Sequence, residues 1–182
     1  MFFPDKLNYY NFNITHLQNI FPLIAVVFFN NISINDNSIK ACESIFDIDF
    51  PAVTYFSADE KFIKIFYNFE VKKLNNFFDL HNFDLLFLFS QPVFIKFNFI
   101  YKILKHYENN SLDNLSLFYK KENETLKNID YNNFIIKKDL IKKHQKFNDL
   151  IISIQNLISE KKYFICNDIK VYSIDNFLKI KK

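Results

Sequence analysis

The side chains of this sequence that are best suited to binding chemistry are lysines, which gather in the C-terminal part of the chain. Residues 101–182 contain 16 Lys and 10 acidic residues, whereas residues 1–100 contain 7 Lys and 10 acidic residues. Lysine ammonium groups neutralise phosphates without reading base sequence, so this distribution predicts salt-sensitive binding to RNA or to an anionic lipid surface. The candidate RNA-binding residues are Lys102, Lys105, Lys137, Lys138, Lys142, Lys143, Lys146, Lys179, Lys181 and Lys182.

Three tyrosines near lysines in the sequence, Tyr101, Tyr107 and Tyr119, could stack on unpaired bases. No motif of a known RNA-binding domain accompanies them. A second interpretation is equally open, in which the lysines form the solvated faces of ordinary helices and are abundant because of codon usage.

Residue types that often carry catalysis or bind metals are present, but not in the spacings that such chemistry needs. The four His residues form no metal-binding motif. Cys42 lies on the apolar face of a predicted helix, where a Cys is usually a small buried side chain. Ser57, Asp59 and Glu60 form an acidic turn after a predicted strand, which is either functional or acidic for solubility. We therefore expect a protein that is not an enzyme and has no metal site.

The sequence contains no Gly in 182 residues. Loops that cradle the phosphates of nucleotides depend on Gly, because its backbone adopts positive φ and lets N–H groups approach the ligand. Neither a P-loop nor a dinucleotide-binding fingerprint can therefore be written in this sequence. We expect no cofactor and no small-molecule substrate, and we expect Asn to occupy turns that require positive φ.

The composition indicates an A/T-rich gene. Phe, Tyr, Ile, Asn and Lys are abundant, whereas Arg and Trp are absent. Only two Cys are present, which fits a reducing compartment, and no secretory or transit-peptide pattern is visible. These features predict an organelle-encoded protein of the mitochondrial matrix. The apolar stretch 85–104 is interrupted by Gln91, Pro92, Lys96 and Asn98, so it is expected to be buried core rather than a membrane span.

The elements that must position these residues begin with a β-α-β unit. The continuous apolar run Leu23–Phe29 is typical of a strand buried on both faces. Asn35–Ser38 are good N-cap residues, and the residues after them have apolar side chains at helical spacing, which predicts a helix. Phe50–Phe56 is a second apolar run and predicts a second strand. The connection is long enough for a crossover helix between parallel strands.

Further patterns predict a strand over 62–67, a helix starting near Pro92, and loop with weak helix over 108–136. They also predict one amphipathic helix over Asp139–Ser159 and a hairpin over 163–172 that turns at Asn167 and Asp168. The predicted fold class is α/β. Residues 1–108 would form a partial Rossmann-like parallel sheet with helices, and residues 109–182 a basic, mainly helical extension with a terminal hairpin.

Part of the β-α-β region resembles a known family. Ile20–Val27, then Ser38–Glu43, then Ile48–Ser57 follow the order of an apolar strand, a helix with an alanine–acidic pattern and an isoleucine-proline-valine strand. This order resembles the second half of small-subunit ribosomal protein two, the universal S-two family. Phe50–Val53 stands at the isoleucine-proline-valine place, and Phe62–Asn68 resembles the strand before the family's proline-glycine-asparagine segment. The resemblance covers about a quarter of the chain.

The resemblance implies a structural role without catalysis. The chain departs from the family where Ser57 replaces the turn aspartate and where the family's N-terminal half has no counterpart. We therefore expect a constituent of the mitochondrial small ribosomal subunit that contacts rRNA and neighbouring ribosomal proteins. The alternative is an accessory subunit of a mitochondrial membrane complex, such as a respiratory enzyme or the ATP synthase.

Overall fold

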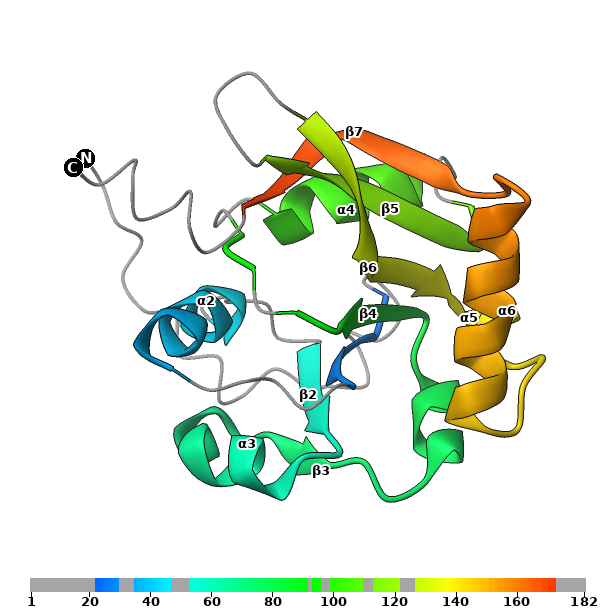
Figure 1. Cartoon of the computed structure of the whole chain (residues 1–182). Coiled ribbons are helices and arrows are strands. Elements are labelled where there is room, and N and C mark those ends of the chain that lie inside the picture. Colours follow the sequence, from blue (N-terminus) through cyan, green and yellow to red (C-terminus); the bar gives the residue numbers. More distant parts are fainter. Residues whose placement is uncertain are drawn as a thin grey trace.

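Two central strands, β1 (Ile24–Phe28) and β4 (Leu85–Phe89), organise the fold, because every residue of both is buried. The computed structural model shown in Figure 1 describes residues 22–29, 35–46, 53–91, 93–95, 99–109, 113–121 and 127–172. Within these residues the strands form a single sheet of seven in the order β3-β2-β1-β4-β6-β5-β7. The remaining strands are β2 (Val53–Ser57), β3 (Lys72–Lys73), β5 (Leu115–Lys121), β6 (Lys127–Lys137) and β7 (Phe164–Tyr172).

The predicted β-α-β unit is confirmed. Strand β1 pairs in parallel with β2, and helix α2 (Asp36–Phe46) connects them. The α2 amino end is fixed by Asn35, whose Oδ1 accepts hydrogen bonds from the N–H groups of Asn37 and Ser38 at 3.0 and 2.9 Å. Strand β1 also pairs in parallel with β4, which confirms the predicted α/β fold class with a mainly parallel sheet.

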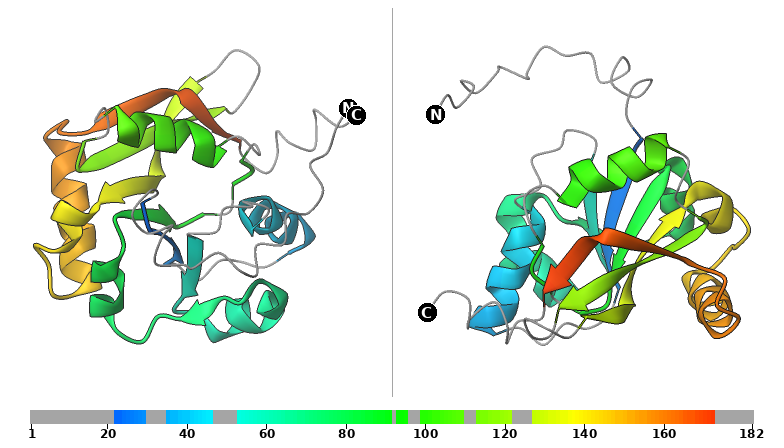
Figure 2. Two further views of the ribbon diagram at one scale, coloured as in Figure 1. Left: turned by 180° about the vertical axis from the view of Figure 1, so that it is seen from behind. Right: turned by 90° about the horizontal axis from the view of Figure 1, so that it is seen from above.

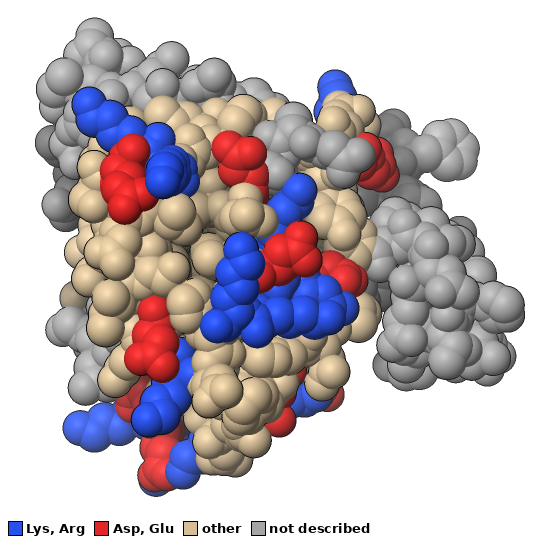
Figure 3. All heavy atoms as spheres, turned by 90° about the vertical axis from the view of Figure 1, so that its right-hand side faces the viewer, with Lys and Arg blue, Asp and Glu red and all other residues tan. Residues whose placement is uncertain are grey.

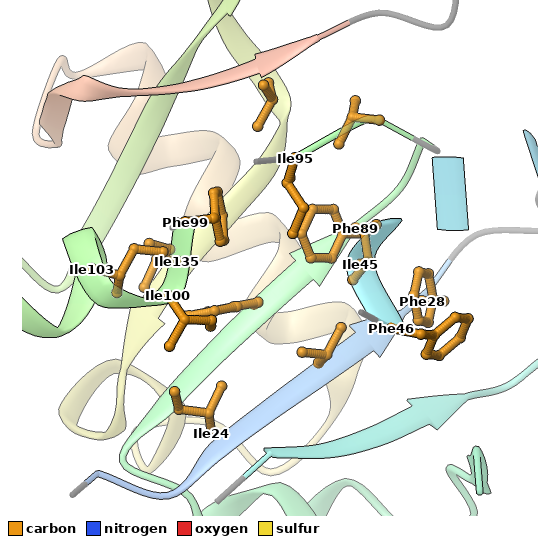
Figure 4. Packing of buried hydrophobic residues seen from close by; sticks show 14 of the residues in the cluster. Ile24, Phe28, Ile45, Phe46, Phe89, Ile95, Phe99, Ile100, Ile103 and Ile135 are labelled. Atoms are coloured by element: carbon orange, nitrogen blue, oxygen red, sulfur yellow. The ribbon is translucent and has the colours of Figure 1, made fainter. Parts of the chain in front are cut away.

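Helical elements cover both faces of the sheet, since alternate residues of the central strands need apolar cover on opposite sides (Figure 2). One face is covered by α2, α3 (Glu60–Ile65) and α4 (Phe99–Glu108). The other face is covered by η3 (Phe77–Asn82), α5 (Lys138–Ile141) and α6 (Phe147–Ser159). Figure 4 shows the first of these cores, with packed side chains that include Ile24, Phe28, Ile45, Phe46, Phe89, Phe99 and Ile103.

The C-terminal part is not the mainly helical extension that the sequence predicts. Residues after 108 supply strands β5, β6 and β7, which continue the sheet beyond β4. Strand β6 pairs antiparallel with both β4 and β5, and β7 runs parallel to β5. The predicted long helix is divided into α5 and α6, which are separated by residues 142–146.

The terminal hairpin is also wrong, because the predicted turn lies inside strand β7. Phe118 pairs with Cys166 and Tyr119 with Lys170, so the register shifts by three residues between them. Asn167 and Asp168 therefore belong to a bulge in one long strand. An equivalent shift occurs in β6, where Phe118 pairs with Asp130 although Leu117 pairs with Phe134.

The strand predicted over residues 62–67 is wrong: residues 62–65 belong to helix α3, Phe66 ends that helix, and Tyr67 begins the short 3-10 helix η2 (Tyr67–Phe69). Asp59 begins this helix, because its carboxylate accepts a hydrogen bond from the Lys61 N–H at 2.8 Å. Phe62 and Phe66, four residues apart, are both buried on the same core. Of the helix predicted from Pro92, the structure describes α4 over Phe99–Glu108. Residues 93–95 are not helical, and Phe94 forms an isolated antiparallel bridge with Tyr172. Pro92 and residues 96–98 lie outside the described residues.

Positive φ is adopted by Glu70 and Lys161 among the described residues, and not by Asn as expected. Lys161 follows α6, where its N–H donates to the Ile158 carbonyl at 3.0 Å and the Lys162 N–H donates to the Leu157 carbonyl at 2.8 Å. These two bonds form the Schellman arrangement, whose left-handed position is usually Gly.

We expect Lys161→Gly to raise the free energy of unfolding by about 1 kcal/mol, because Gly adopts the left-handed region without a Cβ clash. Urea denaturation measures the change. The matched control is Glu160→Gly, at a position with φ −82°, where Gly should destabilise. An unchanged or lower stability for Lys161→Gly would contradict the assignment of this helix end.

Phe118 of β5 tests whether residues on both sides of 108 share one core. Its side chain is fully buried, and its ring lies 5.3 Å from that of Phe99 in α4. Phe118→Ala should lower the free energy of unfolding by about 3–5 kcal/mol in one cooperative transition. Tyr101→Ala, at a residue that is 72% exposed, should change it by less than about 0.5 kcal/mol. Two separate unfolding transitions would contradict a shared core.

Candidate nucleic-acid interface

The lysines of residues 137–146 are close in sequence, but the segment that carries them runs from the amino ends of the central strands to their carboxyl ends. Lys137 pairs with Leu85, at the amino end of β4. Phe147, directly after Lys146, has its ring 5.6 Å from that of Phe29, which follows the carboxyl end of β1. The segment between these points therefore crosses one face of the sheet.

Lys137 and Lys138, which lie beside the amino end of β4, contact other residues of the protein. The Lys138 ammonium lies 3.2 Å from Asp84 Oδ1, and the other oxygen of that carboxylate accepts a hydrogen bond from the Leu23 N–H at 2.9 Å. The Lys137 ammonium lies 6.0 Å from the centre of the Tyr107 ring. Burial, and then the carboxylates of Asp84 and Asp139, raise the pKa of the Tyr107 hydroxyl. Both lysines are half-buried, so part of their role is structural.

The lysines of the turn between α5 and α6 are the most available for binding. Lys142, Lys143 and Lys146 are all exposed and lie within five residues. Residues 137–149 contain five Lys and two acidic residues, Asp139 and Asp149. Figure 3 views the side of the molecule that carries α5 and α6 and shows groups of lysines with acidic side chains between them. We define Lys142, Lys143 and Lys146 as the basic turn.

The other predicted RNA-binding lysines are not placed with the basic turn. Lys102 and Lys105 lie on α4, which covers the opposite face of the sheet. Lys105 is exposed and Lys102 is half-buried. The terminal lysines lie outside the described residues, namely Lys179, Lys181 and Lys182. The structure therefore brings together three of the ten predicted residues on an exposed surface.

The tyrosines proposed for stacking differ in exposure. Tyr101 is 72% exposed on α4. Tyr107 is half-buried beneath Lys137. The side chain of Tyr119 lies outside the described part of the chain. Tyr101 alone of the three is both described and strongly exposed.

A cleft that sequence reasoning missed lies at the carboxyl ends of the parallel strands. It has a volume of about 220 Å³ and is lined by Phe29, Ala58, Leu74, Asn75, Phe77 and Phe147. At this point the connections between strands pass from one face of the sheet to the other. Helices α2 and α3 connect β1, β2 and β3 on one face, whereas η3 connects β3 to β4 on the opposite face. Such a switch point is where open α/β sheets usually bind ligands. We name these six residues the aromatic cleft.

The acidic turn beside the cleft is used for local structure. The buried Ser57 hydroxyl accepts a hydrogen bond from the Asp59 N–H at 3.1 Å, and Asp59 caps helix α3. Glu60 forms an ion pair with Lys73, and the hydrogen bond that the Lys73 ammonium donates to Glu60 lowers the pKa of the Glu60 carboxyl. These contacts favour the structural interpretation of the turn.

Metal ligation has no geometric support within the described ranges, where no three His, Cys, Asp or Glu side chains form a group able to hold an ion. His81 and His144 each have a buried Nε2 atom without a hydrogen-bond partner among the described residues. The His81 ring packs edge-on against Phe77 with centroids 5.2 Å apart. These two histidines therefore belong to the packing around η3 and α5.

Comparison of the sequence with protein-family models and with curated proteins found no match. In the part of the chain that the structure covers, no helix has the length and apolar character needed to cross a bilayer. The apolar stretch expected to be core does contribute core, since its first five residues form β4 and Phe99–Leu104 belong to α4.

The two cysteines provide a chemical test of the interpretation of Cys42 as a core residue. Cys42 and Cys166 are buried, and burial followed by the charge of Glu43 raises the pKa of the Cys42 thiol to about 12. At pH 8 the Cys42 thiol is therefore protonated, and the protonated form is not the nucleophile.

We expect the folded protein to show no fast reaction with a disulfide reagent such as DTNB at pH 8. The same protein in urea should react at both thiols, which serves as the control. The absorbance of the released thiolate measures the reaction. A fast phase of one thiol in the folded protein would show that a cysteine is accessible and activated.

Proposed function

We propose that this protein is a non-catalytic structural constituent of the mitochondrial small ribosomal subunit, where it binds rRNA and neighbouring ribosomal proteins. The observation that carries the RNA-binding part is the basic turn, in which three exposed lysines lie within five residues. The mitochondrial location and the ribosomal assignment come from the composition and from the resemblance to the S-two family.

The location of the basic turn supports a role in phosphate binding. It connects two helices whose apolar residues are held against the sheet, with Leu140 and Ile141 before it and Leu150 and Ile154 after it. The lysine stems therefore project from an anchored segment. Lysines placed in this way attract phosphates by charge alone, which suits rRNA contacts that do not depend on base sequence.

The organisation of the core supports a non-catalytic role. Its buried groups are mainly Phe, Ile and Leu, and the buried polar residues Asp130 and Asn133 bond to each other at 2.7 Å. Asn133 Oδ1 also accepts the Ser90 N–H at 3.1 Å. These polar groups stabilise the bulge in β6, so they are engaged in the structure of the sheet.

The decisive variant combines Lys142→Gln, Lys143→Gln and Lys146→Gln. It should bind small-subunit rRNA more weakly at low salt, because three phosphate contacts are lost. The slope of log K against log salt concentration should fall in magnitude by about 2–3, since each contact contributes roughly 0.7–0.9. Filter binding across a salt series measures the slope, and co-sedimentation of the native protein with ribosomal subunits tests the assembly.

The matched control removes the same charge from the opposite face, by Lys40→Gln, Lys61→Gln and Lys64→Gln on α2 and α3. These lysines are also exposed. An equal loss of slope in both triple variants would mean that only net charge matters. Failure to co-sediment with ribosomal subunits at low salt, together with retention in the pellet after carbonate extraction, would favour the membrane-complex alternative.

A further inference from the structure

The aromatic cleft lies beside the basic turn. Phe147 lines the cleft and follows Lys146 directly. The cleft also contains Phe29 from the end of β1 and Phe77 from η3, and the three phenylalanines are brought together from positions far apart in the sequence. The apolar recess and the basic turn therefore meet at Phe147.

The size of the cleft limits its ligand. Sites for cofactors and drug-sized molecules usually have volumes of about 300–1,000 Å³. The aromatic cleft has about 220 Å³, which suits one flat ring system rather than a whole dinucleotide. A single nucleobase is a ligand of this size and shape.

The three phenylalanine rings of the cleft are inclined to one another. The rings of Phe77 and Phe147 have centroids 6.2 Å apart and planes inclined at 69°, and Phe29 is inclined at 53° to Phe147. The phenylalanines therefore form walls at angles to one another rather than a closed stack. Base–aromatic contacts are tolerant of sequence, because every base has a π face.

Polar groups at the rim complement the apolar walls. Asn75 lines the cleft and is exposed, and an amide both donates and accepts hydrogen bonds, as base edges do. Lys146 supplies positive charge for a phosphate of the same nucleotide chain. The nearby acids Asp59 and Glu60 are engaged with the α3 amino end and with Lys73. This charge distribution favours an anionic polymer that carries flat aromatic rings over an apolar protein side chain.

We propose that the aromatic cleft binds a single unpaired nucleobase of RNA while the basic turn neutralises adjacent phosphates. This inference rests on the RNA-binding function proposed above and specifies which form of RNA the surface selects. Double-stranded segments would contact the lysines but could not place a base in the cleft.

The test compares two fluorescent ten-nucleotide probes by anisotropy. One is single-stranded oligouridylate, and the other has the same sugar–phosphate backbone with every base replaced by hydrogen. The full-length protein should bind the oligouridylate about 5- to 150-fold more tightly, the range measured for one stacked base. Both probes should show the same salt dependence.

Ala58→Leu is the blocking variant, because Ala58 is exposed and a larger side chain there fills the cleft without removing a packed residue. It should bring the ratio of the two affinities close to one and leave the salt slope unchanged. Ala58→Ser keeps the cleft open and should retain the ratio. Phe147→Leu should lower the ratio, whereas Phe78→Leu, at a residue 51% exposed and outside the cleft lining, should not.

The outcomes separate this inference from the function on which it rests. Equal binding of both probes by the unaltered protein would overturn the base site and leave phosphate binding intact. Binding of neither probe at low salt would overturn both. If Ala58→Leu weakened co-sedimentation with ribosomal subunits but kept the affinity ratio, the cleft would seat an apolar group of another protein, and the base site would be wrong.

Discussion

The constraint on which the structure depends is the burial of strands β1 and β4 on both faces. Their side chains alternate between two cores, with Ile24 and Val26 in one and Ala25 and Val27 in the other. A sheet of this kind is stable only when both faces are covered, so helical elements must lie on each side. Charged residues are thereby excluded from the central layer and confined to edges, turns and outer helix surfaces.

Asp84 shows how the centre of the sheet is coupled to the charged surface. Its carboxylate accepts the Leu23 N–H ahead of β1 and lies beside the Lys138 ammonium after β6. Its backbone carbonyl also accepts the Lys138 N–H at 2.9 Å. One residue thus connects the ends of three adjacent strands. Lys138, the first residue of α5, is therefore bound to the end of the sheet, although its sequence neighbours resemble a uniform basic cluster.

Sequence reasoning correctly predicted the elements whose hydrophobic pattern is typical of one kind of secondary structure. The apolar runs of β1 and β2, with a capped helix between them, have few other solutions. Strands β5 and β6 were missed because Lys and Asn interrupt their apolar residues, as in Lys127–Lys137. The sequence Phe62–Tyr67, whose first four residues belong to α3, has high β-propensity, and the preceding Asp59 cap was the overlooked indication of a helix.

Of the candidate site, the exposure of the basic turn could be predicted from the sequence, whereas the relative positions of its residues could not. Exposure of the basic turn follows from its polarity, but its separation from Lys137 and Lys138 depends on how the chain crosses the sheet. The aromatic cleft was not predictable, because Phe29, Phe77 and Phe147 each resemble ordinary core residues in a chain with 25 Phe. Only the strand order brings them to one edge.

The absence of Arg gives the cleft its particular importance in the proposed function. A guanidinium can pair with a phosphate through two hydrogen bonds and can also stack on a base, whereas a lysine ammonium acts as a hydrated point charge. A surface that contains only Lys gains affinity for any phosphate backbone but little discrimination between paired and unpaired RNA. The proposed function therefore assigns discrimination between paired and unpaired RNA to aromatic side chains. The aromatic cleft contains three of them, of which Phe147 directly follows Lys146.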